Sequence, residues 1–252
     1  MRNIRVIARL DVKTEHLVKG VQLEGLRKLG RPNEFARKYY ANGIDEIIYV
    51  DIVASLYERN SLLPIIERAS NDIFIPLTVV GGIRSVDNAR SALQSGADKV
   101  GVNTAAIKNP GLISEIATQF GSQCMVQSIE AKHSSANSWE VYYDNGREKT
   151  GIDVMDWAIE AESRGAGEIF LTSVDCEGAG HGMDIDLISN VCDRVNIPVI
   201  ASGGIGEIEH ARVVIEKTNV SGIAVARILH YEFNSIAEIK DALKSIDGIE
   251  IR

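Results

Sequence analysis

Short apolar runs alternate with longer amphipathic stretches along the whole chain. The runs are rich in Val and Ile, and they are apolar at nearly every position rather than at every second one. Continuous apolarity of this kind is typical of strands that are buried on both faces, and therefore of parallel sheets. The pattern predicts eight strands: Ile4–Leu10, Glu46–Asp51, Ile75–Val80, Lys99–Val102, Cys124–Ile129, Glu168–Ser173, Pro198–Ala201 and Gly222–Ala226.

Helical patterns fill the intervals between these runs. Asp153 and Ser235 precede two of them as candidate N-caps, and Gly96 and Gly165 follow two others where a left-handed C-cap is expected. The predicted helices are Pro32–Asn42, Ser61–Ala69, Val86–Ser95, Leu112–Phe120, Val154–Arg164, Met183–Val195, Ile208–Thr218 and Ile236–Ser245. Eight strand–helix units predict one (β/α)8 (TIM) barrel domain over residues 1–252, with a doubly wound open sheet as the alternative.

An internal repeat favours the closed barrel. The motif Gly81-Gly82-Ile83 returns as Gly203-Gly204-Ile205, 122 positions later, and each copy follows a predicted strand. The first and fifth predicted strands lead to carboxylates, Asp11 and Glu130. We therefore expect two half-barrel repeats, at about residues 1–122 and 123–252.

Two segments interrupt the rhythm. Lys13–Arg31 is predicted to be a long loop after the first strand. His133–Thr150 is predicted to be a β-hairpin inserted after the fifth strand, because Asp144-Asn145-Gly146 is typical of a tight hairpin turn. Both segments follow strands, so both are expected at the face of the barrel that carries the active site.

Composition excludes several classes of function. The net charge of −8 gives no electrostatic support for nucleic acid or an anionic membrane as a partner. The three cysteines form no disulfide or zinc pattern, and the five histidines lack metal-ligand spacing, so no metal is expected. Neither a secretory signal nor a run of membrane-spanning length is found, which leads us to expect a cytoplasmic protein.

Asp11 and Glu130 are the candidate catalytic pair. Each closes an apolar strand, where barrel enzymes carry catalytic groups, and the first and fifth strands of eight lie opposite each other. One carboxyl group could act as a base and the other as an acid if their environments separate their pKa values. The alternative is a salt bridge from either acid to Lys13, Lys19 or Lys132. We expect Asp11 to be exposed, so that Asp11→Asn would leave folding intact.

The two glycine pairs are candidate phosphate cradles. Backbone N–H groups in such turns suit phosphate. Gly82 with Asn103 and Thr104 would form the first cradle, and Gly203-Gly204 with the end of the eighth strand, Ala226-Arg227, the second. Two cradles imply a substrate with phosphates at both ends.

Four charged residues are expected at the opposite end of the barrel. They lie at or near the starts of the first, second, fourth and sixth strands, and alternating signs could close them into a salt-bridge ring: Arg5, Glu46, Lys99 and Glu168. From spacing alone, the ring is interpreted as a contribution to barrel stability.

Several blocks together resemble the cyclase subunit of imidazole glycerol phosphate synthase, an enzyme of histidine biosynthesis, over essentially the full chain. They include Leu10-Asp11-Val12-Lys13, Gly96-Ala97-Asp98-Lys99-Val100, Val102-Asn103-Thr104, Leu171-Thr172-Ser173 and Ile200-Ala201-Ser202-Gly203-Gly204. The resemblance implies a (β/α)8 barrel without a cofactor. It also implies that ammonia from a partner glutaminase is added to a bisphosphorylated ribulosyl aminoimidazole carboxamide intermediate, giving imidazole glycerol phosphate and the carboxamide ribotide.

The resemblance also implies roles for individual residues. Asp11 and Glu130 would be the catalytic pair, and Asp98 would lie near the glutaminase. The charged ring Arg5, Glu46, Lys99 and Glu168 would be the gate through which ammonia enters. Substrate and phosphate contacts would come from Lys19, Gly82, Asn103, Thr104, Thr172, Glu177, Ser202, Gly203, Gly204 and Arg227.

Six residues depart from the family pattern around the expected site, two of them being Val80, where a third Gly is common, and Ala179, where Thr is usual. Glu130 and Glu177 stand where Asp is usual, Arg9 where Cys is frequent, and Arg227 where a small residue is usual. A carboxylate moved by about 1 Å can cost on the order of a hundredfold in rate. The departures therefore leave two alternatives open. One is a paralogue that aminates a nucleotide-activated sugar for surface polysaccharide, and the other is an inactive barrel that only scaffolds the glutaminase.

Overall fold

Eight parallel strands close into a barrel in the computed structural model, which describes residues 1–54 and 62–252. Each strand pairs with the next, and the last pairs with the first. In barrel order they are β1 (Arg2–Lys13), β4 (Glu46–Asp51), β5 (Leu77–Val80), β6 (Lys99–Val102), β7 (Met125–Ser135), β10 (Glu168–Ser173), β11 (Val199–Ser202) and β12 (Gly222–Val225). The predicted barrel is confirmed, and every predicted strand overlaps one of these.

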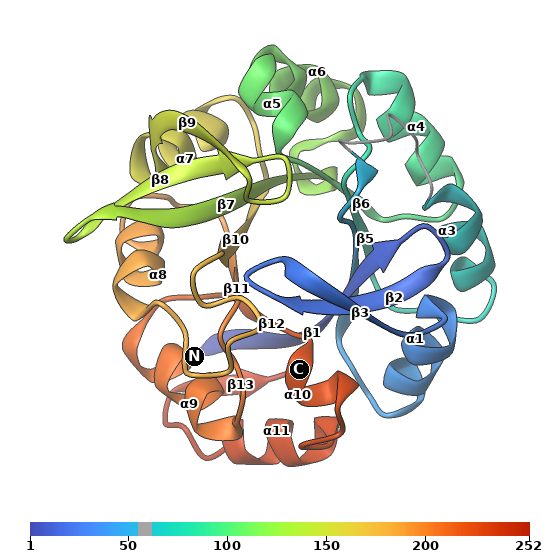
Figure 1. The fold of residues 1–252 in the computed structure, drawn as a ribbon, viewed down its shortest axis with the longest axis vertical. Helices are drawn as coiled ribbons and strands as arrows, with labels where there is room; N and C mark the ends of the chain where they lie inside the picture. The colour runs from blue at the N-terminus through green and yellow to red at the C-terminus, as the bar shows by residue number, and fades with distance from the viewer. Residues whose placement is uncertain (55–61) are drawn as a thin grey trace.

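Helices surround the barrel as an outer ring (Figure 1). They are α1 (Pro32–Ala41), α3 (Leu63–Ser70), α4 (Val86–Gln94), α6 (Gly111–Phe120), α7 (Val154–Ser163), α8 (Ile185–Cys192), α9 (Ile208–Lys217) and α11 (Ile236–Leu243). Each overlaps a predicted helix, although Ser61, the predicted start of one of them, lies outside the described residues.

The predicted caps explain where several helices begin and end. Ser235 forms a capping box with Glu238, and the Asp153 side chain accepts a hydrogen bond from the backbone N–H of Met155. Gly96 and Gly165 adopt φ of 107° and 102°, as expected for left-handed residues after a helix.

Alternation along β1 determines which side chains enter the barrel. Val6, Ala8 and Leu10 pack in the apolar layer between strands and helices, whereas Ile7 belongs to a smaller cluster inside the barrel. Because side chains on a strand alternate between its two faces, the odd-numbered residues Arg5, Ile7, Arg9 and Asp11 form one interior row. This row connects the two ends of the barrel.

The predicted loop Lys13–Arg31 is wrong. The segment is an antiparallel hairpin, β2 (His16–Val21) and β3 (Glu24–Gly30), and it lies across the barrel mouth (Figure 1). Its turn residues Gln22 and Leu23 have φ of 51° and 63°. Asn or Gly usually marks such a turn, so the usual sequence signal is missing.

The second inserted segment has more strands than the predicted hairpin. β7 runs on from the barrel and pairs with β8 (Ser138–Tyr143), which pairs with β9 (Glu148–Asp153). The predicted turn joins β8 to β9, with φ of 54°, 59° and 72° at Asp144, Asn145 and Gly146. Among the described residues, the remaining short elements are α5 (Thr104–Lys108), η1 (Ser122–Cys124), α10 (Arg227–His230) and β13 (Ile249–Ile251).

Within the described part of the chain, no helix combines the length and the apolar character that crossing a membrane requires.

Candidate active site

Asp11 is buried at the barrel mouth, with 2% of its surface exposed, so the expectation of an exposed acid is wrong. Its Oδ1 accepts a hydrogen bond from Arg9 Nε at 2.7 Å, and its Oδ2 accepts one from Lys19 Nζ at 3.2 Å. Burial alone would raise the pKa of Asp11, but the two cations outweigh it and hold that pKa at about 2. Asp11 is therefore a fixed anion at neutral pH.

Glu130 has a different environment, on β7. Its Oε2 accepts a hydrogen bond from the backbone N–H of Gly146 at 2.7 Å, so the inserted segment orients this carboxyl group. Burial raises the pKa of Glu130 to about 7, and the Gly146 hydrogen bond and Arg9 oppose that rise only in part. Lys132 Nζ donates to Gly146 O at 2.6 Å and forms no salt bridge with Glu130, although its charge also opposes the rise in the pKa of Glu130. Glu130 can therefore gain and lose a proton near neutral pH.

Arg9 is a site residue that sequence reasoning noted only as a departure. Its side chain lies inside the barrel with 3% of its surface exposed, above the Phe170 ring. Besides Asp11, its Nη1 contacts Ser202 Oγ at 3.0 Å, Thr172 Oγ1 at 3.2 Å and Glu177 Oε2 at 3.3 Å. Three of the expected substrate contacts thus bind Arg9: Thr172, Glu177 and Ser202. The available signal was a charged residue on the interior row of an apolar strand.

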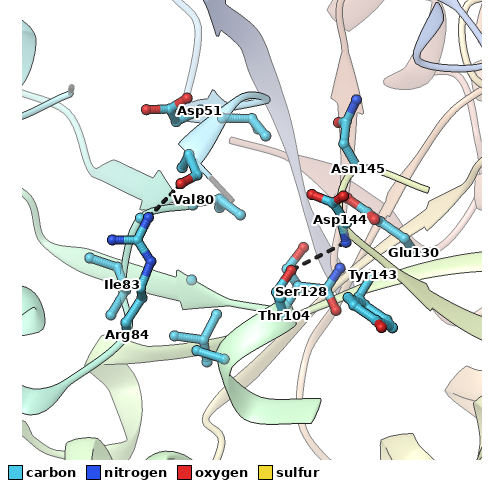
Figure 2. Close-up of a pocket in the computed structure, with 18 of the residues that line it drawn as sticks. Asp51, Val80, Ile83, Arg84, Thr104, Ser128, Glu130, Tyr143, Asp144 and Asn145 are labelled. Carbon is cyan, nitrogen blue, oxygen red and sulfur yellow. Dashed lines mark hydrogen bonds between the residues drawn. The ribbon is translucent and has the colours of Figure 1, made fainter. Parts of the chain in front are cut away.

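The first phosphate cradle opens into a pocket of about 420 Å³. Gly82, Asn103, Thr104 and Glu130 all line it, and Asp11 does not. Figure 2 shows Glu130, Asp144 and Asn145 on one wall and Arg84 on the opposite wall. Thr104 Oγ1 accepts a hydrogen bond from the Asp144 backbone N–H at 3.3 Å, so the turn after β8 closes one side of the pocket.

The second cradle has the same backbone geometry. Gly81 and Gly203 adopt φ of 95° and 97°, and a Cβ atom would lie 2.7 Å from Asp51 O in the first case and 2.6 Å from Ser173 O in the second. Only glycine fits such positions. The cavity beside Gly203 and Gly204 measures only about 10 Å³, and it is lined by Lys19, Glu177 and Arg227 among others.

The four charged residues at the opposite end form a closed ring. Arg5 donates to Glu46 Oε1 at 3.0 Å and to Glu168 Oε1 at 2.6 Å. Lys99 reaches Glu46 Oε2 at 3.4 Å and Glu168 Oε2 at 2.7 Å. Each carboxylate thus binds both cations, which leaves no unpaired charge in the ring.

Asp98 lies beside this ring and is exposed at the same end, where its Oδ2 accepts a hydrogen bond from the Leu77 backbone N–H at 2.8 Å. Among the residues that the structure describes, no group of three or more His, Cys, Asp or Glu side chains could hold a metal ion.

Comparison with known proteins gives consistent results. Residues 5–234 match the family described as "Histidine biosynthesis protein". The chain is 60% identical to the imidazole glycerol phosphate synthase subunit HisF of Legionella pneumophila over 209 residues, which is 83% of this chain and 99% of that protein. It is 46% identical to the protein of the same name from Streptococcus mutans over 248 residues, 98% of each chain. A Dehalococcoides mccartyi protein of that name is 46% identical over 252 residues, 100% of this chain and 99% of its own.

Proposed function

The chain belongs to the family of histidine biosynthesis proteins, and we infer from this membership that it is the cyclase subunit of imidazole glycerol phosphate synthase. It is an enzyme that uses ammonia to convert a bisphosphorylated ribulosyl aminoimidazole carboxamide intermediate to imidazole glycerol phosphate and the carboxamide ribotide. The names of the relatives give no support to the alternative acceptor, a nucleotide-activated sugar.

The two carboxylates divide the chemistry between them. Ammonia attack on the acceptor develops positive charge on nitrogen, and a fixed anion such as Asp11 stabilises such charge. Ring closure then forms a C–N bond, breaks the C–N bond to the carboxamide ribotide and, over the whole reaction, releases one water, so protons must leave the attacking nitrogen and reach the leaving groups. Glu130, with a pKa of about 7, is suited to that transfer at neutral pH. Asp11 thus acts electrostatically, and Glu130 acts as the general acid and base.

The substrate is held by its phosphates. The first phosphate binds in the open pocket, against Gly82, Asn103 and Thr104. The second binds at Ser202, Gly203 and Gly204, with Lys19 and Arg227 as the nearby cations. Binding at both ends would hold the reacting centre between the two halves of the mouth, next to Glu130.

A partner subunit supplies the ammonia. The relatives are each named as a subunit of a synthase, which supports a complex of more than one chain. We assign the glutaminase to the end of the barrel that carries the charged ring and Asp98. Ammonia would pass the ring, cross the barrel interior and arrive at the mouth without exchanging with bulk water. Pairing within the ring keeps this entrance closed to ions.

The observation that carries the proposal is the pair of carboxylates at opposite sides of the mouth, one held ionised and the other with a pKa near neutrality. The direct test is turnover of the bisphosphate substrate by the isolated chain with excess ammonium salt and no glutaminase. Formation of imidazole glycerol phosphate is the expected result. Absence of product, from a folded chain at saturating ammonium, would refute the assignment.

A further inference from the structure

The second phosphate cradle already contains an anion from the protein itself. The Glu177 carboxylate binds Lys19 Nζ through Oε1, and its Oε2 lies 3.3 Å from Arg9 Nη1. A Cβ atom built on Gly203 would be only 3.4 Å from Glu177 Oε2, so the carboxylate lies in the space directly beside this cradle glycine. A phosphate placed in this cradle would bind the same two cations, Lys19 and Arg9.

The space left beside Glu177 is too small for a phosphate. About 10 Å³ is the least that a single water needs, and a phosphate has four oxygens. Arg227 closes the outer side, because its Nη1 donates to Gly178 O at 3.1 Å while its guanidinium lies over the rings of Tyr231 and Phe233. The first cradle, by contrast, opens into about 420 Å³.

The backbone around Glu177 is fixed by the β2–β3 hairpin. Glu177 O accepts a hydrogen bond from the Gln22 backbone N–H at 2.6 Å. A Cβ atom on Gly178 would lie 2.2 Å from Gly20 O, so the two segments are in direct contact. Lys19 comes from the same hairpin. The hairpin thus brings a cation to Glu177 and holds the Glu177 backbone in place.

Charge is balanced within this cluster. Arg9 and Lys19 carry two positive charges, and Asp11 and Glu177 carry two negative ones, all four side chains being at most 4% exposed. A phosphate added without any rearrangement would bring uncompensated negative charge into a buried site, which is costly. A phosphate that displaces Glu177 would instead bind the two cations that Glu177 now contacts, Arg9 and Lys19.

From these observations we propose that Glu177 is an internal competitor for the second phosphate: its carboxylate occupies the Gly203–Gly204 cradle, and a substrate phosphate binds there only by displacing it. The inference rests on the proposed function, because the cradle is assigned to that substrate. It makes Glu177 a specificity-determining residue. Acceptors with one anionic end bind in the open pocket alone, and only a bisphosphate of the right length also displaces Glu177.

Titration with inorganic phosphate at constant ionic strength tests the proposal, because it counts sites without any turnover. Wild type should bind one phosphate per chain in the millimolar range or tighter, and Glu177→Gln should bind one more. The affinity of this second cradle for phosphate should be about tenfold or more higher in Glu177→Gln than in wild type. The reason is that a hydrogen bond to a charged group is worth about 1.5–3 kcal/mol. Glu177→Ala, which removes bulk as well as charge, should act in the same direction and serves if Glu177→Gln does not fold.

Glu216→Gln is the matched control, because the substitution changes the net charge by the same amount as Glu177→Gln. The Glu216 carboxylate is exposed and pairs with Arg212 on α9. Glu216→Gln should bind as wild type does. A phosphate-soaked crystal of Glu177→Gln should place the added phosphate at Gly203 and Gly204. A wild type that fills both cradles with equal affinity, or variants that gain no site, would overturn the proposal. Failure to turn over the bisphosphate would refute the proposed function and leave this count of sites unaffected.

Discussion

Replacing Asp11 by Asn should lower both stability and activity, because the Asp11 carboxylate is buried between two cations. The difference between its ordinary pKa of 3.8 and the value of about 2 in the fold corresponds to about 2–3 kcal/mol of preference for the ionised form. Asn keeps an acceptor oxygen but loses the charge. Arg9 and Lys19 would then share Glu177 as their remaining contacting carboxylate. We expect the free energy of unfolding to fall by about 2–3 kcal/mol at pH 7.

Urea denaturation followed by circular dichroism measures this loss. With a slope of about 2–3 kcal/mol per M, the midpoint should fall by roughly 1 M. The pH dependence gives a second check. Because folding lowers the pKa of Asp11, its contribution is complete above about pH 4 and is lost as the pH falls towards 2. The difference between wild type and Asp11→Asn should therefore shrink across that window.

Asp45→Asn is the control for stability alone. Asp45 is also buried and paired, through Lys240 Nζ at 2.5 Å and the Val6 backbone N–H at 2.7 Å, but it lies directly before β4, away from the mouth. Asp45→Asn should also lose stability, because it breaks a buried ion pair, and it should keep ammonia-dependent turnover. Asp11→Asn should lose turnover by about 10²–10³-fold, the usual cost of removing one electrostatic stabiliser. If Asp11→Asn unfolds at the wild-type midpoint and turns over at the wild-type rate, Asp11 is neither the buried anion nor the catalytic group argued here.

Three further predictions concern Glu130 and the charged ring. At constant free NH3, the rate should change across pH 7 because the pKa of Glu130 is about 7, and Glu130→Gln should remove that change along with most of the activity; an unchanged profile would exclude Glu130 as the proton carrier. Glu130→Asp should retain or increase turnover of the bisphosphate, whereas an inactive variant would mean that the site requires the longer side chain. Lys99→Ala should reduce the product formed per glutamine hydrolysed while activity with ammonium salt falls much less; unchanged coupling would leave the ring with a purely structural role.

The barrel could be predicted from sequence because its signals are local. Buried parallel strands are short apolar runs, and caps such as Ser235 and Asp153 mark where helices begin. The β2–β3 hairpin could not be predicted in the same way. Its turn lacks the residues that favour positive φ, and its position depends on contacts with Asp175 and Glu177, more than 150 residues away.

The residue types of the candidate site could be predicted, but their surroundings could not. Strand ends and glycine pairs pointed to Asp11, Glu130 and both cradles. The burial of Asp11 depends on Arg9, its neighbour on the interior row, and on Lys19, which the hairpin brings in. The contact between Arg9 and Glu177 joins residues 168 positions apart. No local pattern encodes such a pair, so a cradle filled by its own carboxylate could be found only in the folded chain.

The charged ring around Arg5 and the buried cluster around Arg9 are separate, and a last prediction follows from this separation. Arg5 and Arg9 lie on the same interior row of β1, four residues and therefore about 13 Å apart, with Ile7 between them. Arg5 binds Glu46 and Glu168, Arg9 binds Asp11 and Glu177, and the two share no partner among these carboxylates. Losses of stability at such distant sites usually add within about 0.5 kcal/mol.

The double variant Lys99→Ala with Asp11→Asn should therefore lose the sum of the two single losses in urea denaturation. With ammonium salt as the ammonia source, the double variant should turn over at the rate of Asp11→Asn. In this assay no glutaminase delivers ammonia through the ring. A coupling well above 0.5 kcal/mol would mean that the networks communicate through the barrel interior. In that case glutaminase binding at the ring could alter the chemistry at the barrel mouth. The ring would then couple the two ends of the barrel besides admitting ammonia.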